Sequence, residues 1–144
     1  MIKCQNNFLK NDNFWQMHAA LYGKKFPWFK EEGIFSHLLI KEGNINSSQV
    51  DILKPIIEEF KEPIENACAF LIPKNGNENP LVHNLKGKTL IYSLDNCNSQ
   101  NLISSIQKID VKQNRALIID YPTSVIQSRQ SDKDYICMLY VFFK

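Results

Sequence analysis

Histidine and glycine are scarce in this chain of 144 residues, which has three histidines and five glycines. The glycines form no G-x-G-x-x-G pattern and no complete G-x-x-x-x-G-K-S/T loop, so the common nucleotide-binding signatures are absent. The chain also has no H-E-x-x-H motif and no G-x-S-x-G motif. These absences exclude the zinc-protease and serine-hydrolase signatures, and they leave few side chains with which to build a metal site.

Paired cysteines and long apolar runs are also missing. Cys4, Cys68, Cys97 and Cys137 lie far apart and form no C-x-x-C pair. The opening "MIKCQNNFLK" has no apolar stretch of the kind that a secretory signal carries. The longest apolar run, "YICMLYVFF", is about half as long as a membrane-spanning helix. We therefore expect free thiols, a cytoplasmic location and no membrane partner.

Charge is spread along the chain rather than concentrated. The formal net charge is +2 and the lysines are scattered, so nucleic acid is not an expected partner. Apolar residues make up 44% of the chain and charged residues 22%, as in ordinary globular proteins. The length is that of one domain, so we expect a single domain over residues 1–144. Its partner, a small ligand or a protein, and its oligomeric state are left open by these numbers.

Two segments in the first half have helical periodicity. "NDNFWQMHAALYG", at 11–23, repeats apolar residues at helical spacing and stops at a glycine. "NSSQVDILKPIIEEFKEP", at 46–63, does the same, with a proline that requires a kink or a late start. The expected apolar stripes are Phe14, Met17 and Leu21 in the first helix, and Val50, Leu53, Ile57 and Phe60 in the second.

Strand-type segments dominate the second half. They are "NACAFLIP", "KTLIYSLD", "LISSIQKIDV", "RALIIDYP" and "DYICMLYVFF", separated by turn-forming stretches. Several are apolar at consecutive positions, which indicates strands buried on both faces, with Ile91, Leu117 and Leu139 in the core. We predict an α+β fold that is mainly β, a jelly roll (double-stranded β-helix) with the N-terminal helices packed on one sheet.

The order of segments carries a family resemblance. "FWQMHAALYGKKFPWF", "FSHLLIKEGNINSSQVDILKPIIEEF", "VHNLKGKTLIYSLDNCN" and "NRALIID" together resemble the iron(II)/2-oxoglutarate-dependent oxygenases, most closely the small prolyl-hydroxylase-like proteins of marine bacteria and phages. The resemblance covers most of the chain. It implies a jelly roll in which a His-x-Asp/Glu pair and a distal His hold iron. It further implies an Arg or Lys on the last strand that pairs with 2-oxoglutarate.

The residues that the resemblance places at the metal site do not match this pattern. His83 stands where the first ligand is expected, but Leu85 occupies the carboxylate position. No histidine follows His83, and Gln127 is the nearest residue to the distal position. One imidazole is too few to hold Fe(II) against water. The resemblance therefore implies a degenerate site, with no metal and no catalytic residue, in which His83 is vestigial.

The co-substrate position is equally altered. The last strand opens with "DKDY" instead of an arginine, and Arg129 and Lys133 are the nearby cations that remain as candidates for binding 2-oxoglutarate. The other two histidines, His18 and His37, have no carboxylate or cysteine at ligand spacing, so we interpret both as structural or surface residues. No cofactor is predicted for this chain.

Three hypotheses for the function follow. The first is a pseudoenzyme that retains the oxygenase fold and acts as a binding module. The second is an active Fe(II)/2-oxoglutarate dioxygenase with an unorthodox site around His83, for which Asp95, Asp110 or Asp120 on neighbouring strands would supply carboxylates. The third is an unrelated structural or interaction domain with similar strand and helix patterning.

Overall fold

The protein folds into two antiparallel sheets and a small helical layer. The computed structural model describes residues 2–31, 33–74, 80–128 and 132–144. In chain order the elements are β1 (Ile2–Gln5), α1 (Asn11–Tyr22), β2 (Phe29–Glu31), β3 (Ile34–Lys41), β4 (Asn44–Ile45), the 3₁₀ helix η1 (Val50–Leu53), α2 (Lys54–Glu59), β5 (Ile64–Pro73), β6 (Leu81–Leu85), β7 (Thr89–Ser93), β8 (Gln100–Ile103), β9 (Gln107–Asp110), β10 (Arg115–Ile119), β11 (Thr123–Gln127) and β12 (Tyr135–Phe143).

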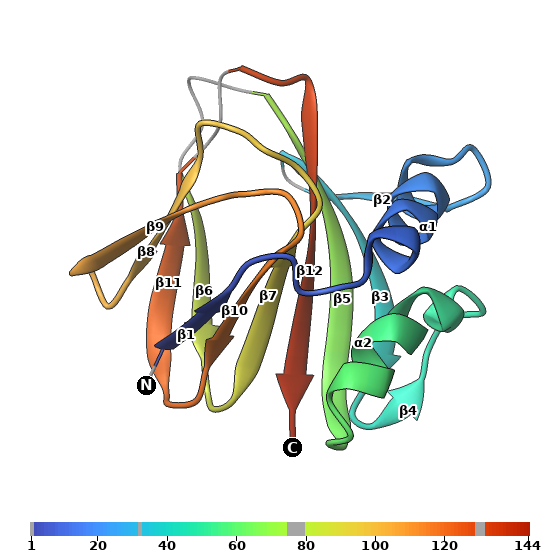
Figure 1. The fold of residues 1–144 in the computed structure, drawn as a ribbon, viewed down its shortest axis with the longest axis horizontal. Coiled ribbons are helices and arrows are strands. Elements are labelled where there is room, and N and C mark those ends of the chain that lie inside the picture. The colour runs from blue at the N-terminus through green and yellow to red at the C-terminus, as the bar shows by residue number, and fades with distance from the viewer. Residues whose placement is uncertain (1, 32, 75–79, 129–131) are drawn as a thin grey trace.

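From β5 onward the chain alternates between the two sheets, except that the β8–β9 hairpin lies wholly in the smaller one. The larger sheet has the order β1-β10-β7-β12-β5-β3-β2, with β4 paired to β3, and the smaller sheet has the order β6-β11-β8-β9. The two sheets face each other (Figure 1), with strands of the second half of the chain assigned to them in turn. This winding is a jelly roll, so the predicted mainly-β α+β fold is confirmed.

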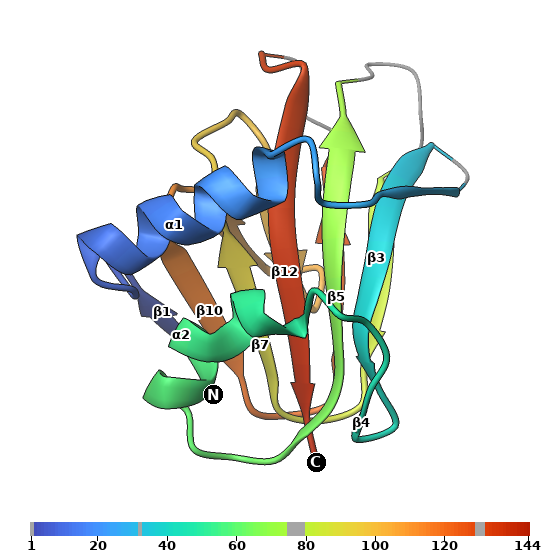
Figure 2. The ribbon, with the colours of Figure 1, turned by 90° about the vertical axis from the view of Figure 1, so that its right-hand side faces the viewer.

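Both helices lie on the outer face of the larger sheet. Figure 2 shows α1 and α2 in front of β10, β7, β12 and β5, on the side away from the smaller sheet. Helix α1 buries Phe14, Met17 and Leu21, the stripe that its periodicity predicts. The expected helical cap on one sheet is therefore present.

Each side of the larger sheet has its own hydrophobic core. Strand β12 serves both, because its side chains alternate in direction. Cys137, Leu139, Val141 and Phe143 pack with the helices, whereas Ile136, Met138 and Tyr140 pack between the two sheets. Ile91, Leu117 and Leu139 are all buried, as the continuous apolar runs predicted. The interior between the sheets is where the resemblance would place a metal.

Two local predictions require correction. The second helical segment is a 3₁₀ turn followed by the short helix α2, so Ile56 is fully buried and the predicted Ile57 is 42% exposed. The tighter 3₁₀ turn, with three residues per turn, shifts the phase of the apolar stripe. "LISSIQKIDV" is a hairpin of β8 and β9 rather than one strand, because Ser104 and Ser105 adopt positive φ angles and form the turn.

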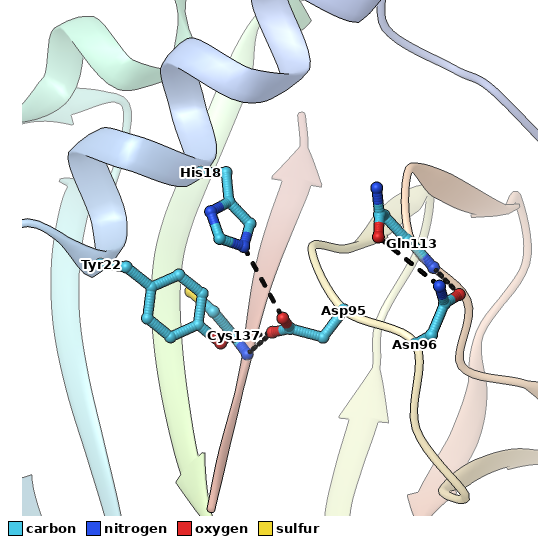
Figure 3. A network of polar contacts seen from close by, with 6 residues as sticks. All are labelled: His18, Tyr22, Asp95, Asn96, Gln113 and Cys137. Atoms are coloured by element: carbon cyan, nitrogen blue, oxygen red, sulfur yellow. Dashed lines mark hydrogen bonds and ion pairs between the residues drawn. The ribbon is translucent and has the colours of Figure 1, made fainter. Parts of the chain in front are cut away.

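Asp95 connects α1 to the beginning of β12. Its carboxylate accepts hydrogen bonds from the hydroxyl of Tyr22 and, at 2.8 Å, from the backbone N–H of Cys137 (Figure 3). The Nε2 of His18 lies 3.8 Å from the same carboxylate. Burial, followed by the hydrogen bond to Asp95, raises the pKa of Tyr22 well above its usual range, so the phenol remains a donor.

Asn114 ties the N-terminal segment to the β7–β10 pair. Its backbone has a φ of 57° and its side chain is buried. The side-chain Oδ1 accepts hydrogen bonds from the N–H of Leu9 at 3.0 Å and from the hydroxyl of Tyr92 at 2.5 Å. The Nδ2 donates to the Leu9 carbonyl at 3.0 Å. This one amide therefore satisfies three buried polar groups.

Within the described residues, no helix is long and apolar enough to cross a membrane.

We expect Asn114→Ala to lower the free energy of unfolding by about 3–5 kcal/mol, because three hydrogen bonds are lost and their buried partners remain unsatisfied. Urea unfolding and thermal melts measure this loss, which corresponds to a fall in Tm of roughly 10 °C or more.

Asn7→Ala is the matched control. Asn7 also has a positive φ, of 50°, but it is exposed and makes no side-chain hydrogen bond among the described residues. Its replacement is expected to cost about 1–2 kcal/mol for the left-handed backbone alone. Equal losses in the two variants would show that the Asn114 side chain contributes nothing beyond its backbone conformation.

Candidate functional site

His83 lies in the middle of β6 with its ring in the interior between the sheets. Its ring centroid is 4.3 Å from that of Tyr140 on β12, at an interplanar angle of 34°. The Phe70 ring on β5 is 5.5 Å away. The strands expected from the sequence do not include His83, whereas the structure places it in a short strand of its own. Strand β6 was missed because polar His83 and Asn84 interrupt its short apolar pattern.

Leu85 occupies the same face of β6 as His83, because side chains two residues apart in a strand point to the same side. It is 4% exposed and packs in the interior cluster between the two sheets. The position that the resemblance assigns to a carboxylate thus contributes an aliphatic side chain to the core. It has no oxygen or nitrogen atom to offer a metal.

The register of β6 and β11 sets which residue faces His83 across the sheet. Val125 is paired directly with His83, and Gln127 is paired with Leu81. Directly opposite residues have their Cβ atoms about 4.5–5.5 Å apart, so Val125 is the nearest inward-facing neighbour on β11. Val125 is fully buried. Val125 cannot be singled out from the sequence, because strand register is not visible in an isolated strand pattern.

Gln127 also faces the interior and is 1% exposed. Its Oε1 accepts a hydrogen bond of 3.3 Å from the hydroxyl of Tyr140. Burial raises the pKa of Tyr140 above its usual range, which keeps the phenol protonated as the donor. The structure therefore brings His83 and Gln127 together through Tyr140, which contacts both.

Among the described residues, three buried polar atoms in this region have no hydrogen-bond partner. They are Nε2 of His83, Nε2 of Gln127 and Oδ1 of Asn101. Asn101 is paired with Gln127 in the smaller sheet, and both side chains are almost completely buried. Buried polar groups are normally paired, so each of these atoms has unused capacity for one further hydrogen bond.

Burial lowers the pKa of His83 below its ordinary value. The cause is desolvation, which disfavours the charged imidazolium in the aromatic and aliphatic surroundings of the ring. No carboxylate lies within ion-pair distance of His83 among the described residues. His83 is thus a neutral imidazole near neutral pH.

The carboxylates considered for a rebuilt site lie elsewhere. Asp95 is engaged with α1 and β12, and Asp110 accepts a hydrogen bond of 2.7 Å from the side chain of Gln100. Asp120 is exposed at the end of β10. Within the part of the chain that the structure describes, no three His, Cys, Asp or Glu side chains come together as a potential metal-binding group.

The two candidate cations can be placed only in part. Arg129 lies outside the described residues. Lys133 lies just before β12 and lines a surface hollow of about 510 Å³ together with His18, Tyr22 and Asp95. This hollow is separate from the His83 region, because its lining does not include His83, Leu85, Val125 or Gln127.

The other two histidines have roles within the fold. His18 lies on α1 beside Asp95, as described above. His37 is buried in β3, where its Nδ1 is 2.7 Å from the Pro27 carbonyl and its Nε2 is 2.6 Å from Oγ of Ser47. These contacts hold the chain on either side of β3 and agree with a structural histidine.

The residues around His83 do not fit a three-ligand Fe(II) site. The unpartnered Nε2 of His83 is a suitable metal ligand. The neighbouring inward-facing residues are aliphatic: Leu85 on the same strand and Val125 on the strand opposite. Gln127 directs its oxygen to Tyr140. A 2-His-1-carboxylate face requires three converging donors, and among these described positions only His83 offers one.

Comparison with solved structures identifies the same architecture in known enzymes. A 2OG-Fe(II) oxygenase family oxidoreductase from Burkholderia pseudomallei has a TM-score of 0.72 at 6% identity, covering 97% of this chain and 82% of that one. A prolyl hydroxylase from Trichoplax adhaerens, solved with a hypoxia inducible factor peptide fragment, has a TM-score of 0.62 at 15% identity, covering 99% and 83%.

Hydroxypropylphosphonic acid epoxidase from S. wedmorenis is similar over a smaller part of its length. Its TM-score is 0.54 at 6% identity, and the match covers 83% of this chain but 56% of the epoxidase. No protein-family model matches the chain, and no curated protein matches it in sequence. At these identities the likeness is one of fold: the chain shares the jelly roll of 2-oxoglutarate oxygenases.

Proposed function

We propose that this protein is an oxygenase-like pseudoenzyme, a jelly-roll binding module of the 2-oxoglutarate oxygenase type without the iron site. The observation that carries this proposal is the pair of aliphatic side chains beside His83. Leu85 follows on the same face of β6, and Val125 lies directly opposite on β11. With one imidazole as the only donor among these three positions, the affinity for Fe(II) is too low for a resident metal.

Binding rather than catalysis is supported by the unpartnered polar atoms. Three buried atoms have no hydrogen-bond partner among the described residues: Nε2 of His83, Nε2 of Gln127 and Oδ1 of Asn101. The interior around them is otherwise well packed. An unpaired buried polar group costs about 1–3 kcal/mol, and a ligand or water that supplies the partner recovers it. These groups would give a bound molecule specificity without taking part in any reaction.

The cysteines support a cytoplasmic location as part of the same proposal. All four are free thiols, and one of them, Cys4, is exposed. Free thiols persist in a reducing compartment, whereas oxidising compartments favour disulfides.

Neither Mn(II), the redox-inert mimic of Fe(II), nor 2-oxoglutarate is expected to stabilise the protein. A ligand that binds only the native state raises stability by about 2.7 kcal/mol at 100 times its Kd, and this shifts Tm by roughly 5 °C or more in a domain of this size. Thermal melts under argon, with and without millimolar Mn(II) and 2-oxoglutarate, should therefore superimpose for the wild type and for His83→Ala.

A shift in Tm in these melts would contradict the proposal, and its response to His83→Ala would locate the binding site. A shift in the wild type that disappears in His83→Ala would establish an unorthodox metal site and an active oxygenase. A shift that persists in His83→Ala would place binding elsewhere on the molecule.

The pH dependence of stability tests the state of His83. Because its folded-state pKa lies below the unfolded value of about 6.5, the unfolded chain binds the proton first as pH falls. The wild type therefore loses stability below pH 6.5, and the loss continues until the pH reaches the folded pKa. His83→Phe removes this contribution while keeping an aromatic ring against Tyr140.

Urea unfolding at pH 7.5, 6.5 and 5.5 measures the difference between the two proteins. We expect His83→Phe to gain stability relative to the wild type as pH falls. Val82→Phe, on the outward face of the same strand, is the control and should follow the wild-type pH dependence. Parallel curves for His83→Phe and the wild type would mean that His83 titrates as it does in water.

A further inference from the structure

A second pocket lies at the end of the jelly roll where the β6–β7 turn meets the last residues of β12. It has a volume of about 490 Å³, within the range of small-molecule sites. Figure 1 shows this end of the molecule near the C-terminus. We call it the turn pocket. The lining residues on which its chemistry depends are Lys86, Gly87, Lys88, Phe142, Phe143 and Lys144.

The floor of the turn pocket is aromatic and held in place by both cores. Phe142 stacks on Tyr140, with ring centroids 6.3 Å apart. Phe143 packs against Phe60 on the helix side, at 5.6 Å. The backbone N–H of Phe143 also donates to the Lys88 carbonyl at 3.0 Å, which fixes the turn above the floor. Because successive side chains of β12 point to opposite faces, Phe142 provides the apolar surface on which a flat ring can lie, and Phe143 anchors the strand on the helix side.

The rim of the turn pocket is cationic. The lining includes three side-chain ammonium groups, those of Lys86, Lys88 and Lys144, and one side-chain carboxylate, that of Glu65. Lys88 already forms an ion pair, because its Nζ lies 2.6 Å from a Glu62 carboxylate oxygen. The same Nζ lies over the rings of Phe60 and Phe143. Among the described residues, Lys86 and Lys144 have no ion-pair partner. Neither charge is neutralised by a described side chain, and the Nζ of Lys144 lies beside Gly43.

Gly87 leaves room beside these lysines. A Cβ added at this position would meet no atom within 4 Å, and its φ lies outside the left-handed region. The amide of Asn84, also in the lining, makes no hydrogen bond among the described residues. Space, a free amide and two unpaired ammonium groups therefore adjoin the aromatic floor.

We propose that the turn pocket binds a small organic anion that has a carboxylate on a flat aromatic ring. The carboxylate lies against the Lys86 and Lys144 ammonium groups, and the ring lies on Phe142. The inference rests on the proposed function, since it assigns a ligand class to a protein that acts by binding. Charge complementarity selects the anion, and the aromatic floor selects the ring.

Three probes of the same shape test the role of charge. They are 2-naphthoate, its neutral amide and the 2-naphthylmethylammonium cation, each titrated into the full chain and followed by NMR and calorimetry. 2-Naphthoate should bind with a Kd in the millimolar range or below, and the amide should bind about tenfold more weakly. The cation should not bind. Equal affinity for all three, or no binding of 2-naphthoate, overturns the proposal.

Variants then locate the site. The double substitution Lys86→Ala with Lys144→Ala should weaken 2-naphthoate binding about tenfold, as loss of two exposed charge contacts predicts. Gly87→Leu, which fills the open space, should weaken it at least as much. Lys108→Ala removes the same charge from the exposed strand β9 and should leave the Kd unchanged. Unchanged binding in both pocket variants would refute the assignment.

Thermal melts of each variant identify any that fail to fold. If Gly87→Leu unfolds, the lysine double variant carries the test by itself. The two proposals fail separately, because Mn(II) and 2-oxoglutarate probe His83, whereas 2-naphthoate probes the turn pocket. His83→Ala should therefore bind 2-naphthoate as the wild type does.

Discussion

The burial of β12 on both faces is the constraint on which the rest of this structure depends. This strand lies between β5 and β7 in the larger sheet, and its alternating side chains supply both hydrophobic cores. One set anchors the helices and the other fills the space between the sheets. Burying apolar area is the dominant favourable term in folding, so a strand that contributes to two cores stabilises both layers at once.

The same strand determines the chemistry of the interior. Tyr140 lies against the His83 ring and donates a hydrogen bond to Gln127, and Phe142 continues the aromatic row to the turn pocket. Large rings from β12 thus occupy positions beside the one imidazole of the interior. Aliphatic Leu85 and Val125 complete its surroundings. The low-polarity environment that results favours neutral groups, as the lowered pKa of His83 reflects.

Polar side chains, rather than more apolar area, hold the helical layer and the N-terminal segment in register with the sheet. Asp95 joins α1 to the backbone of β12, and Asn114 joins Leu9 to Tyr92. Hydrogen bonds are directional, so they fix orientation where hydrophobic contact alone would allow sliding. The two pockets discussed above lie at opposite ends of this frame, one beside Asp95 before β12 and one at the end of β12.

The sequence by itself determined the elements whose burial is nearly complete. Burial of a whole face leaves a periodic or continuous apolar pattern in the sequence. This pattern identified the α1 stripe of Phe14, Met17 and Leu21 and the apolar runs of β5, β7, β10 and β12. Strands β6 and β11 of the smaller sheet were not identified, since both are short and polar residues interrupt their apolar patterns. His83, Leu85 and Gln127 could be singled out by position along the chain. Only the tertiary structure decided that Val125 faces His83 and that Tyr140 joins His83 to Gln127, because register and packing between sheets arise from contacts between residues distant in sequence.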